Sequence, residues 1–194
     1  MPTGWADLQN PAFKGEVLMP DPNSSGTGYL HVNAVLQARG ADAGWELLKS
    51  VDPNMAQYTS SGSKPCKAAR AGEYTVGISL AFTAMKSIED GYPLAMVFPK
   101  SGVGYELEGS GLMASSDNKA DAQRFLDWTL SAEALALYGQ YKALITAPGV
   151  DTSAAAAEAG LPADIRSILF PVDFVESANN QTKVKAEWKD RFGR

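Results

Sequence analysis

The spacing of apolar and polar residues switches several times along the first half of the chain between a strand-like and a helix-like repeat. This switching predicts alternating strands and helices. The short apolar run Gly15–Met19 is typical of a buried strand, and Thr27–Arg39 has the residue spacing of a helix. The same alternation continues as far as Phe98. The further predicted helices are Ala43–Val51, Pro65–Ala71 and Leu80–Asp90, and the further predicted strands are Met55–Thr59, Tyr74–Ser79 and Pro93–Phe98. This order predicts an α/β fold, with a mostly parallel sheet flanked by helices.

The second half of the chain is less regular. A strand-like stretch at Tyr105–Ala114 is interrupted by two glycines, and Asn179–Phe192 has the spacing of a terminal amphipathic helix. Three helices are predicted between them, at Lys119–Leu130, from Ser131 onward, and in a short Ala-rich piece at Ser153–Ala159.

Two turns rich in hydroxyl groups stand where predicted strands end. The first runs from Asp21 to Tyr29 and supplies Ser24, Ser25, Gly26 and Thr27; the second runs from Thr59 to Pro65 and supplies Thr59, Ser61 and Ser63. Serine and threonine are common helix N-caps, so the simpler interpretation of each turn is the start of a helix. In parallel sheets, however, ligands bind at the carboxyl ends of strands, and a helix N-terminus favours an anion. The two turns together therefore indicate a small, oxygen-rich ligand.

The composition of the chain excludes several classes of protein. The 194 residues are 45% hydrophobic and 20% charged, with a net charge of −5 and no basic run, so nucleic acid is not an expected partner. No apolar run reaches the ~20 residues of a membrane helix, and Met1–Trp5 lacks the features of a signal peptide. Cys66 and His31 are each the only residue of their type, which leaves no disulfide, no cysteine-based metal site and little material for nucleophilic catalysis. We expect His31 on the first helix, in a structural role.

Several short motifs follow one another in an order and spacing that resemble the solute-binding proteins of ABC importers, of the ferric-iron and 2-aminoethylphosphonate type. The resemblance extends from Trp5 to about Tyr138. The motifs are Trp5-x-Asp7-Leu8, Pro11-x-x-Lys14-Gly15, Asp21–Thr27, Asn54-x-x-x-Tyr58-Thr59-x-Ser61-Gly62-Ser63, Gly72-Glu73-x-x-x-Gly77-Ile78, Phe98-Pro99-x-x-Gly102-x-Gly104-Tyr105-Glu106 and Ala122-x-x-Phe125-Leu126-Asp127-Trp128.

The resemblance implies a type II periplasmic-binding-protein-like fold, an extracytoplasmic location and an ABC permease as partner. Residues 1–92 are then the second-lobe α/β domain, with helix N-termini facing the ligand, and residues 93–194 are the crossover and a first-lobe-derived segment with C-terminal helices. In this family a signal peptide and the opening of lobe 1 precede Trp5, so we expect a chain without the N-terminal part of lobe 1, either excised, truncated or working with less than two lobes. An incomplete lobe leaves a sheet edge exposed, which predicts a homo-oligomer.

The resemblance also guides the choice of ligand. Ferric-binding relatives carry a tandem tyrosine pair after the Gly-Glu-x-x-x-Gly strand, where this chain has Leu80-Ala81-Phe82-Thr83. Ferric iron needs anionic oxygen ligands, which phenylalanine does not supply, so a phosphonate or similar oxyanion is favoured over iron. No metal, cofactor or catalytic residue is expected. The predicted ligand-binding residues are Ser24, Ser25, Gly26, Thr27, Thr59, Ser61, Ser63 and Phe82, the last lining the organic part of the solute or packing in the core.

Two other classes of function stay open. An enzyme is conceivable with Glu106 and Glu108, or Asp127, as acid and base, because residues two apart on a strand share a face. Glu106 and Glu108 are alternatively an ammonium site on the solute-binding protein, or solvated surface. An interaction or sensor domain derived from a binding protein is the third class.

Overall fold

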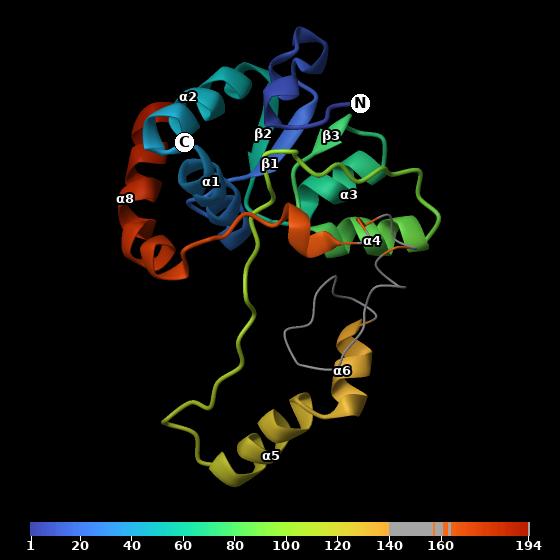
Figure 1. Cartoon of the computed structure of the whole chain (residues 1–194), viewed down its shortest axis with the longest axis vertical. Coiled ribbons are helices and arrows are strands. Elements are labelled where there is room, and N and C mark those ends of the chain that lie inside the picture. The colour runs from blue at the N-terminus through green and yellow to red at the C-terminus, as the bar shows by residue number, and fades with distance from the viewer. Residues whose placement is uncertain (140–156, 158–160, 163, 194) are drawn as a thin grey trace. The chain divides into compact units, whose positions relative to one another are not determined.

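The computed structural model describes residues 1–139, 157, 161–162 and 164–193. They fall into two compact units: unit 1 joins Met1–Tyr105 with Asp164–Arg194, and unit 2 is Glu106–Ala163 (Figure 1). The predicted division at residue 92 separates two lobes of the family fold, which are not the same as these compact units. That division therefore stays a prediction.

Unit 1 is built around a parallel sheet. Strand β1 (Val17–Pro20) lies between β2 (Met55–Thr59) and β3 (Val76–Gly77), in the order β2-β1-β3. Pro20 pairs with Thr59, so β1 and β2 end at the same level. Parallel neighbours need crossover connections, and helices supply them here. This arrangement confirms the predicted α/β class.

Helices cover both faces of this sheet. Figure 1 shows α1, α2 and α8 together on one side of the strands and α3 with α4 on the other. Their limits agree closely with the predicted ones except for α8, which begins at Phe174 rather than Asn179 because Asp173 caps it, its Oδ1 accepting from the N–H of Glu176 at 2.9 Å. The helices are α1 (Gly26–Arg39), α2 (Ala41–Val51), α3 (Lys64–Arg70), α4 (Ala81–Glu89) and α8 (Phe174–Phe192), with short 3-10 turns η1 (Trp5–Gln9), η2 (Pro11–Phe13), η3 (Asp52–Asn54) and η4 (Ile165–Ile168).

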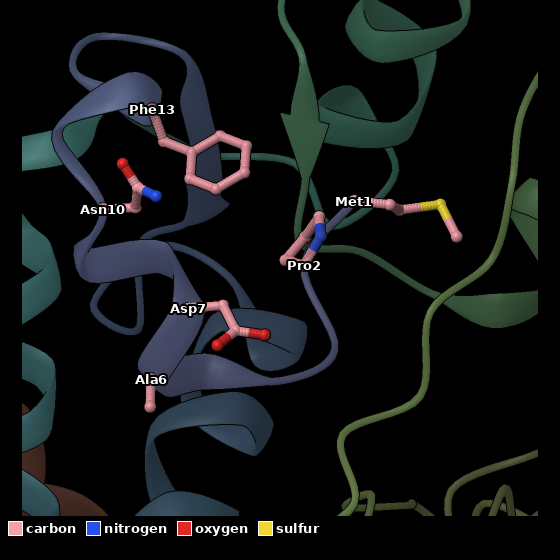
Figure 2. A pocket seen from close by; sticks show the side chains of 6 residues that line it. All are labelled: Met1, Pro2, Ala6, Asp7, Asn10 and Phe13. Atoms are coloured by element: carbon pink, nitrogen blue, oxygen red, sulfur yellow. The ribbon is translucent and has the colours of Figure 1, made fainter.

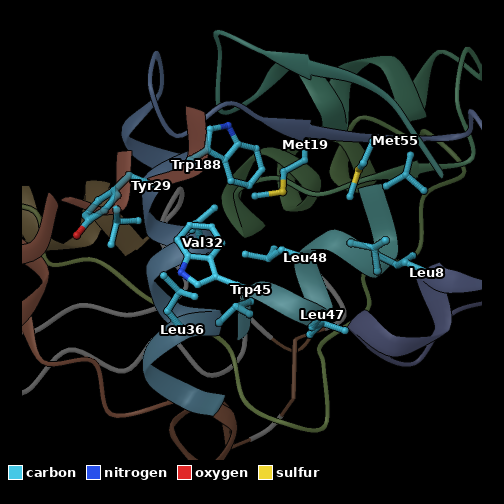
Figure 3. Close-up of a cluster of buried hydrophobic side chains, with 14 residues drawn as sticks. Leu8, Met19, Tyr29, Val32, Leu36, Trp45, Leu47, Leu48, Met55 and Trp188 are labelled. Atoms are coloured by element: carbon cyan, nitrogen blue, oxygen red, sulfur yellow. The ribbon is translucent and has the colours of Figure 1, made fainter. Parts of the chain in front are cut away.

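The hydrophobic core of unit 1 lies between β1 and the helices α1, α2 and α8 (Figure 3). Successive side chains of a strand point to opposite faces, so Val17 and Met19 join this core while Leu18 faces the side of α3. Trp188 of α8 is completely buried. The C-terminal helix is also tied to α1 by polar contacts, because Asn33 donates from Nδ2 to the hydroxyl of Ser177 at 2.7 Å.

Unit 2 contains helices α5 (Lys119–Thr129) and α6 (Ala132–Gly139), close to the predicted limits. Large apolar side chains are exposed on it, including Phe125 at 61% and Leu130 at 71%. The Phe125 and Trp128 rings stack with their centroids 5.7 Å apart. Apolar side chains gathered in this way are a feature of interaction surfaces.

Two predicted strands are wrong. Pro93–Phe98 and Tyr105–Ala114 have no regular structure, although the first stretch has a buried-strand composition. No strand among the described residues pairs with either, and a lone strand leaves its backbone N–H and C=O groups unsatisfied. The predicted helix at Ser153–Ala159 lies outside the described residues, apart from Ala157. In the described ranges, no helix is both long and apolar enough to traverse a bilayer.

Candidate functional site

The first hydroxyl-rich turn is organised by Asp21. Its backbone oxygen accepts from the N–H of Ser25 at 2.8 Å, and its side-chain Oδ1 accepts from the N–H of Asn23 at 2.8 Å. The buried Ser25 is the N-cap of α1, with Oγ accepting from the N–H of Gly28 at 3.3 Å. Ser24 is exposed beside it. The turn therefore ends a strand and starts a helix within five residues, as its composition predicts.

The second turn follows β2. The carbonyl of Thr59 accepts from the N–H of Asp21 at 2.8 Å, which fastens the two strand ends together. The Thr59 hydroxyl donates to the carbonyl of Ser61 at 2.9 Å and so serves the turn itself. The hydroxyl oxygens of Ser61 and Ser63 lie 3.3 Å apart at the exposed side. Ser63 precedes α3 without capping it through its side chain.

The two turns meet at Thr27 and Gly62. A methyl group added to Gly62 would lie 2.2 Å from Thr27 Oγ1 and 2.7 Å from Thr27 Cβ, so only glycine fits against this threonine. The segment that follows β3 reaches the same place, because the Ser79 hydroxyl donates to the carbonyl of Gly62 at 2.5 Å. Three segments far apart in sequence thus converge at one edge of the sheet.

Phe82 is the predicted binding residue that lies outside the two turns. It is 38% exposed in the first turn of α4, three residues beyond Ser79. Glu106 and Glu108 are exposed residues of unit 2 and do not lie on a strand, so the argument that they share a strand face is wrong.

Sequence reasoning missed the parts that Gly62 and Ser79 play in joining these segments. Ser79 closes the predicted strand Tyr74–Ser79, so the strand-end argument applied to the first two turns would have found it. Gly62 carries no such signal, because its role comes from a contact with a residue 35 positions earlier in the chain.

His31 lies one helical turn after Thr27 on α1 and packs edge-on against Trp5, with ring centroids 6.4 Å apart. Burial lowers the pKa of His31 to about 4, and a hydrogen bond with the backbone of Ser79 opposes that shift. At neutral pH the imidazole is therefore uncharged.

Acidification is expected to destabilise the fold through His31. Its ordinary pKa is 6.5, so the unfolded chain takes up a proton at a higher pH than the folded chain. The contribution of His31 to the free energy of unfolding is fully present above pH 6.5, and it falls by about 3 kcal/mol as the pH is lowered toward 4. Urea unfolding at several pH values, compared between the wild type and His31→Gln, measures it: the variant should lose less stability on acidification. The same pH dependence in both proteins would contradict the assignment.

A hollow of about 390 Å³ lies at the N-terminal segment, lined by Met1, Pro2, Ala6, Asp7, Asn10 and Phe13 (Figure 2). Asp7 is engaged locally, since its Oδ2 accepts from the N–H and the hydroxyl of Thr3, and this lowers the pKa of Asp7. None of the predicted binding residues lines this hollow. The residues that the structure describes contain no cluster of three or more His, Cys, Asp and Glu side chains suited to a metal ion.

The sheet with its crossover helices, and the turns gathered at its carboxyl edge, are matched by a known family. The chain belongs to the bacterial extracellular solute-binding proteins, whose family model matches residues 1–178. Members of this family are extracellular or periplasmic binding proteins.

Three individual similarities are informative. The periplasmic binding protein AfuA from Actinobacillus pleuropneumoniae, with exogenous fructose-6-phosphate bound, has a TM-score of 0.79 and 30% identity, covering 100% of this chain and 60% of AfuA. A protein of Haemophilus influenzae is 38% identical over 133 residues, which are 69% of this chain and 38% of that protein. A Bordetella ferric binding protein has a TM-score of 0.65 at 20% identity, covering 97% of this chain and 62% of its own, and shares the fold. The chain thus spans less than two thirds of each of these proteins.

Proposed function

We propose that the chain is the substrate-binding component of an ABC importer and binds a small oxyanion, such as a phosphonate, at the N-terminus of α1. It acts outside the cytoplasm, delivers the solute to a membrane permease and performs no chemistry on it. The observation that carries this proposal is the contact of Thr27 with Gly62, which joins the two hydroxyl-rich turns.

The chemistry of the joined turns suits an anion. Helical geometry leaves the N–H groups of Gly26 and Thr27 without carbonyl partners inside α1, and the 14-residue helix adds the positive end of its dipole. The exposed hydroxyl of Ser24 and the Ser61–Ser63 pair supply further donors. Hydrogen bonds from neutral donors to a charged oxygen are stronger than those between neutral groups. Phe82 is then suited to line the organic part of the solute.

The similarity to AfuA supports a phosphorylated or phosphonate ligand, since that protein was solved with fructose-6-phosphate at 30% identity. Ferric iron is the alternative, and Leu80–Thr83 argues against it because these side chains include no anionic oxygen. A sensor domain without a small ligand remains the third class, and it predicts that no solute binds.

A thermal-shift screen tests the ligand class. The panel contains 2-aminoethylphosphonate, fructose-6-phosphate, phosphate, sulfate, small carboxylates, polyamines and ferric citrate. A ligand that binds only the folded state raises the melting temperature, and we expect a rise with the phosphonate or the phosphate ester. A rise with ferric citrate alone would favour the iron alternative, and a flat screen would contradict solute binding by this chain.

Replacing Ser25 or Ser61 by alanine is expected to weaken binding of the ligand found in that screen by about 1 kcal/mol or more each, because each loses a hydrogen bond. Isothermal titration calorimetry measures the change. Ser60→Ala is the matched control, since Ser60 is exposed in the same turn and is not assigned to the site. If both variants bind the ligand as tightly as the control, Ser25 and Ser61 do not belong to the binding site. Ser25→Ala also removes a helix cap, so its melting temperature is measured in parallel.

Self-association through unit 2 is a separate prediction. The exposed apolar side chains of α5 and the residues that follow it support a homodimer. Light scattering after size exclusion should give a dimer for the wild type and a monomer for Leu130→Asp. Val175→Asp is the control, because Val175 of unit 1 is exposed to the same 71% as Leu130. A monomeric wild type would contradict the prediction.

A further inference from the structure

Ser79 follows β3 at the carboxyl edge of the sheet, and the backbone before it is firmly held. Ile78 donates its N–H to the carbonyl of Leu18 in β1 at 2.8 Å. Gly77 packs on the backbone at the end of the second turn, since a Cβ there would lie 2.3 Å from the carbonyl oxygen of Pro65. The Ser79 side chain therefore reaches the second turn from a fixed support.

The hydrogen bond of Ser79 fixes the peptide unit between Gly62 and Ser63. The Ser79 hydroxyl donates to the Gly62 carbonyl at 2.5 Å. In a trans peptide the C=O and N–H groups point in opposite directions, and the described residues contain no cis peptide. The N–H of Ser63 is thus turned away from Ser79, and it has no hydrogen-bond partner among the described residues.

The orientation of this peptide matters because the proposed solute is an anion. Thr27 packs on Gly62, so the peptide lies where the two hydroxyl-rich turns join. An N–H group stabilises an anionic oxygen beside it, whereas a carbonyl oxygen in the same place would repel it. Glycine restricts the rotation of a neighbouring peptide plane less than any other residue, so a separate restraint has to hold this orientation.

We propose that Ser79 is a positioning residue of the anion site: it holds the Gly62 carbonyl on its own side and so directs the Ser63 N–H toward the oxygens of the solute. This N–H then acts together with the N–H groups of Gly26 and Thr27 at the start of α1. The inference rests on the proposed oxyanion site and adds to it a backbone donor, with the side chain that orients it.

Calorimetry on Ser79→Ala tests the proposal, with 2-aminoethylphosphonate and fructose-6-phosphate as the probes. The affinity for a probe that binds the wild type should fall about tenfold, the effect of one lost hydrogen bond to a charged group. Ser79→Thr keeps the hydroxyl donor and should recover most of that affinity.

Thr75→Val is the matched control. It also removes a hydroxyl donor from the segment around β3, but the Thr75 hydroxyl donates to Glu16 Oε2 at 2.8 Å, before the start of β1 and away from the two turns. In urea unfolding it should lose a similar amount of stability to Ser79→Ala, because each variant loses one side-chain hydrogen bond. Its affinity for the probe should equal that of the wild type, which separates positioning of the site from stabilisation of the fold.

Amide resonances identify the donor that Ser79 orients. In an assigned ¹H–¹⁵N spectrum of the wild type, the Ser63 amide proton should move downfield on saturation with the probe, because a short hydrogen bond to a charged oxygen deshields the proton. In Ser79→Ala the same resonance should move less.

The outcomes distinguish the two proposals. If the wild type binds a probe and Ser79→Ala binds it equally well, or if the Ser63 resonance does not respond, the inference about Ser79 is overturned, while the oxyanion site is judged by the Ser25 and Ser61 variants. If neither probe binds the wild type, both proposals are overturned.

Discussion

Replacing Trp188 by alanine is expected to lower the free energy of unfolding by about 3–5 kcal/mol. The side chain is completely buried, with Phe192 at 4.3 Å and Tyr58 at 5.0 Å between ring centroids. Its indole nitrogen is buried without a partner in the described structure, so the loss comes from packing and the cavity left behind. Urea unfolding followed by circular dichroism measures the change.

Trp128→Ala is the matched control. Trp128 is 40% exposed in unit 2 and stacks on Phe125, so its removal should cost about 1 kcal/mol or less. Should Trp188→Ala prove too unstable to purify, Trp188→Phe keeps part of the packing and should be destabilised by a smaller amount. Equal stabilities of the Trp188 and Trp128 variants would show that α8 does not pack on the sheet of unit 1 as described.

The local elements of unit 1 could be predicted because their signals are local. Ser25 marks the start of α1, and Pro65 fits the first turn of α3, since a missing N–H costs nothing there. The strand β2 has its predicted limits, Met55–Thr59. Once these elements are known, the parallel order places both hydroxyl-rich turns at one edge.

The errors concern residues whose conformation depends on a distant partner. Pro93–Phe98 has the composition of a strand, but a strand forms only where another strand satisfies its backbone. Within the candidate site, the contact of Thr27 with Gly62 depends on how two segments far apart in the sequence pack together. Periodicity and turn composition hold no information about such packing, so the turns were predictable and their contact was not.

Replacing Gly28 by alanine is expected to destabilise the fold by about 1–3 kcal/mol or more and to weaken ligand binding at the same time. A Cβ at Gly28 would lie 2.5 Å from the carbonyl carbon of Asp21 and 2.5 Å from the carbonyl oxygen of Pro20. Both clashing atoms belong to the backbone, so the clash cannot be relieved by a change of side-chain rotamer. The first turn of α1 therefore has to move away from the end of β1, and Ser25 and Thr27 move with it.

Gly26→Ala is the control for the effect on stability. Gly26 belongs to the same first turn, a Cβ there meets nothing within 4 Å, and neither glycine has a positive φ, so the two substitutions differ in the space available rather than in backbone strain. Alanine is also the better helix former, so this variant should match or slightly exceed the wild type in stability. Chemical unfolding and ligand titration of both variants separate the outcomes. If Gly28→Ala keeps wild-type stability and affinity, α1 does not start against the end of β1, and the hydroxyl groups of the two turns do not form one site.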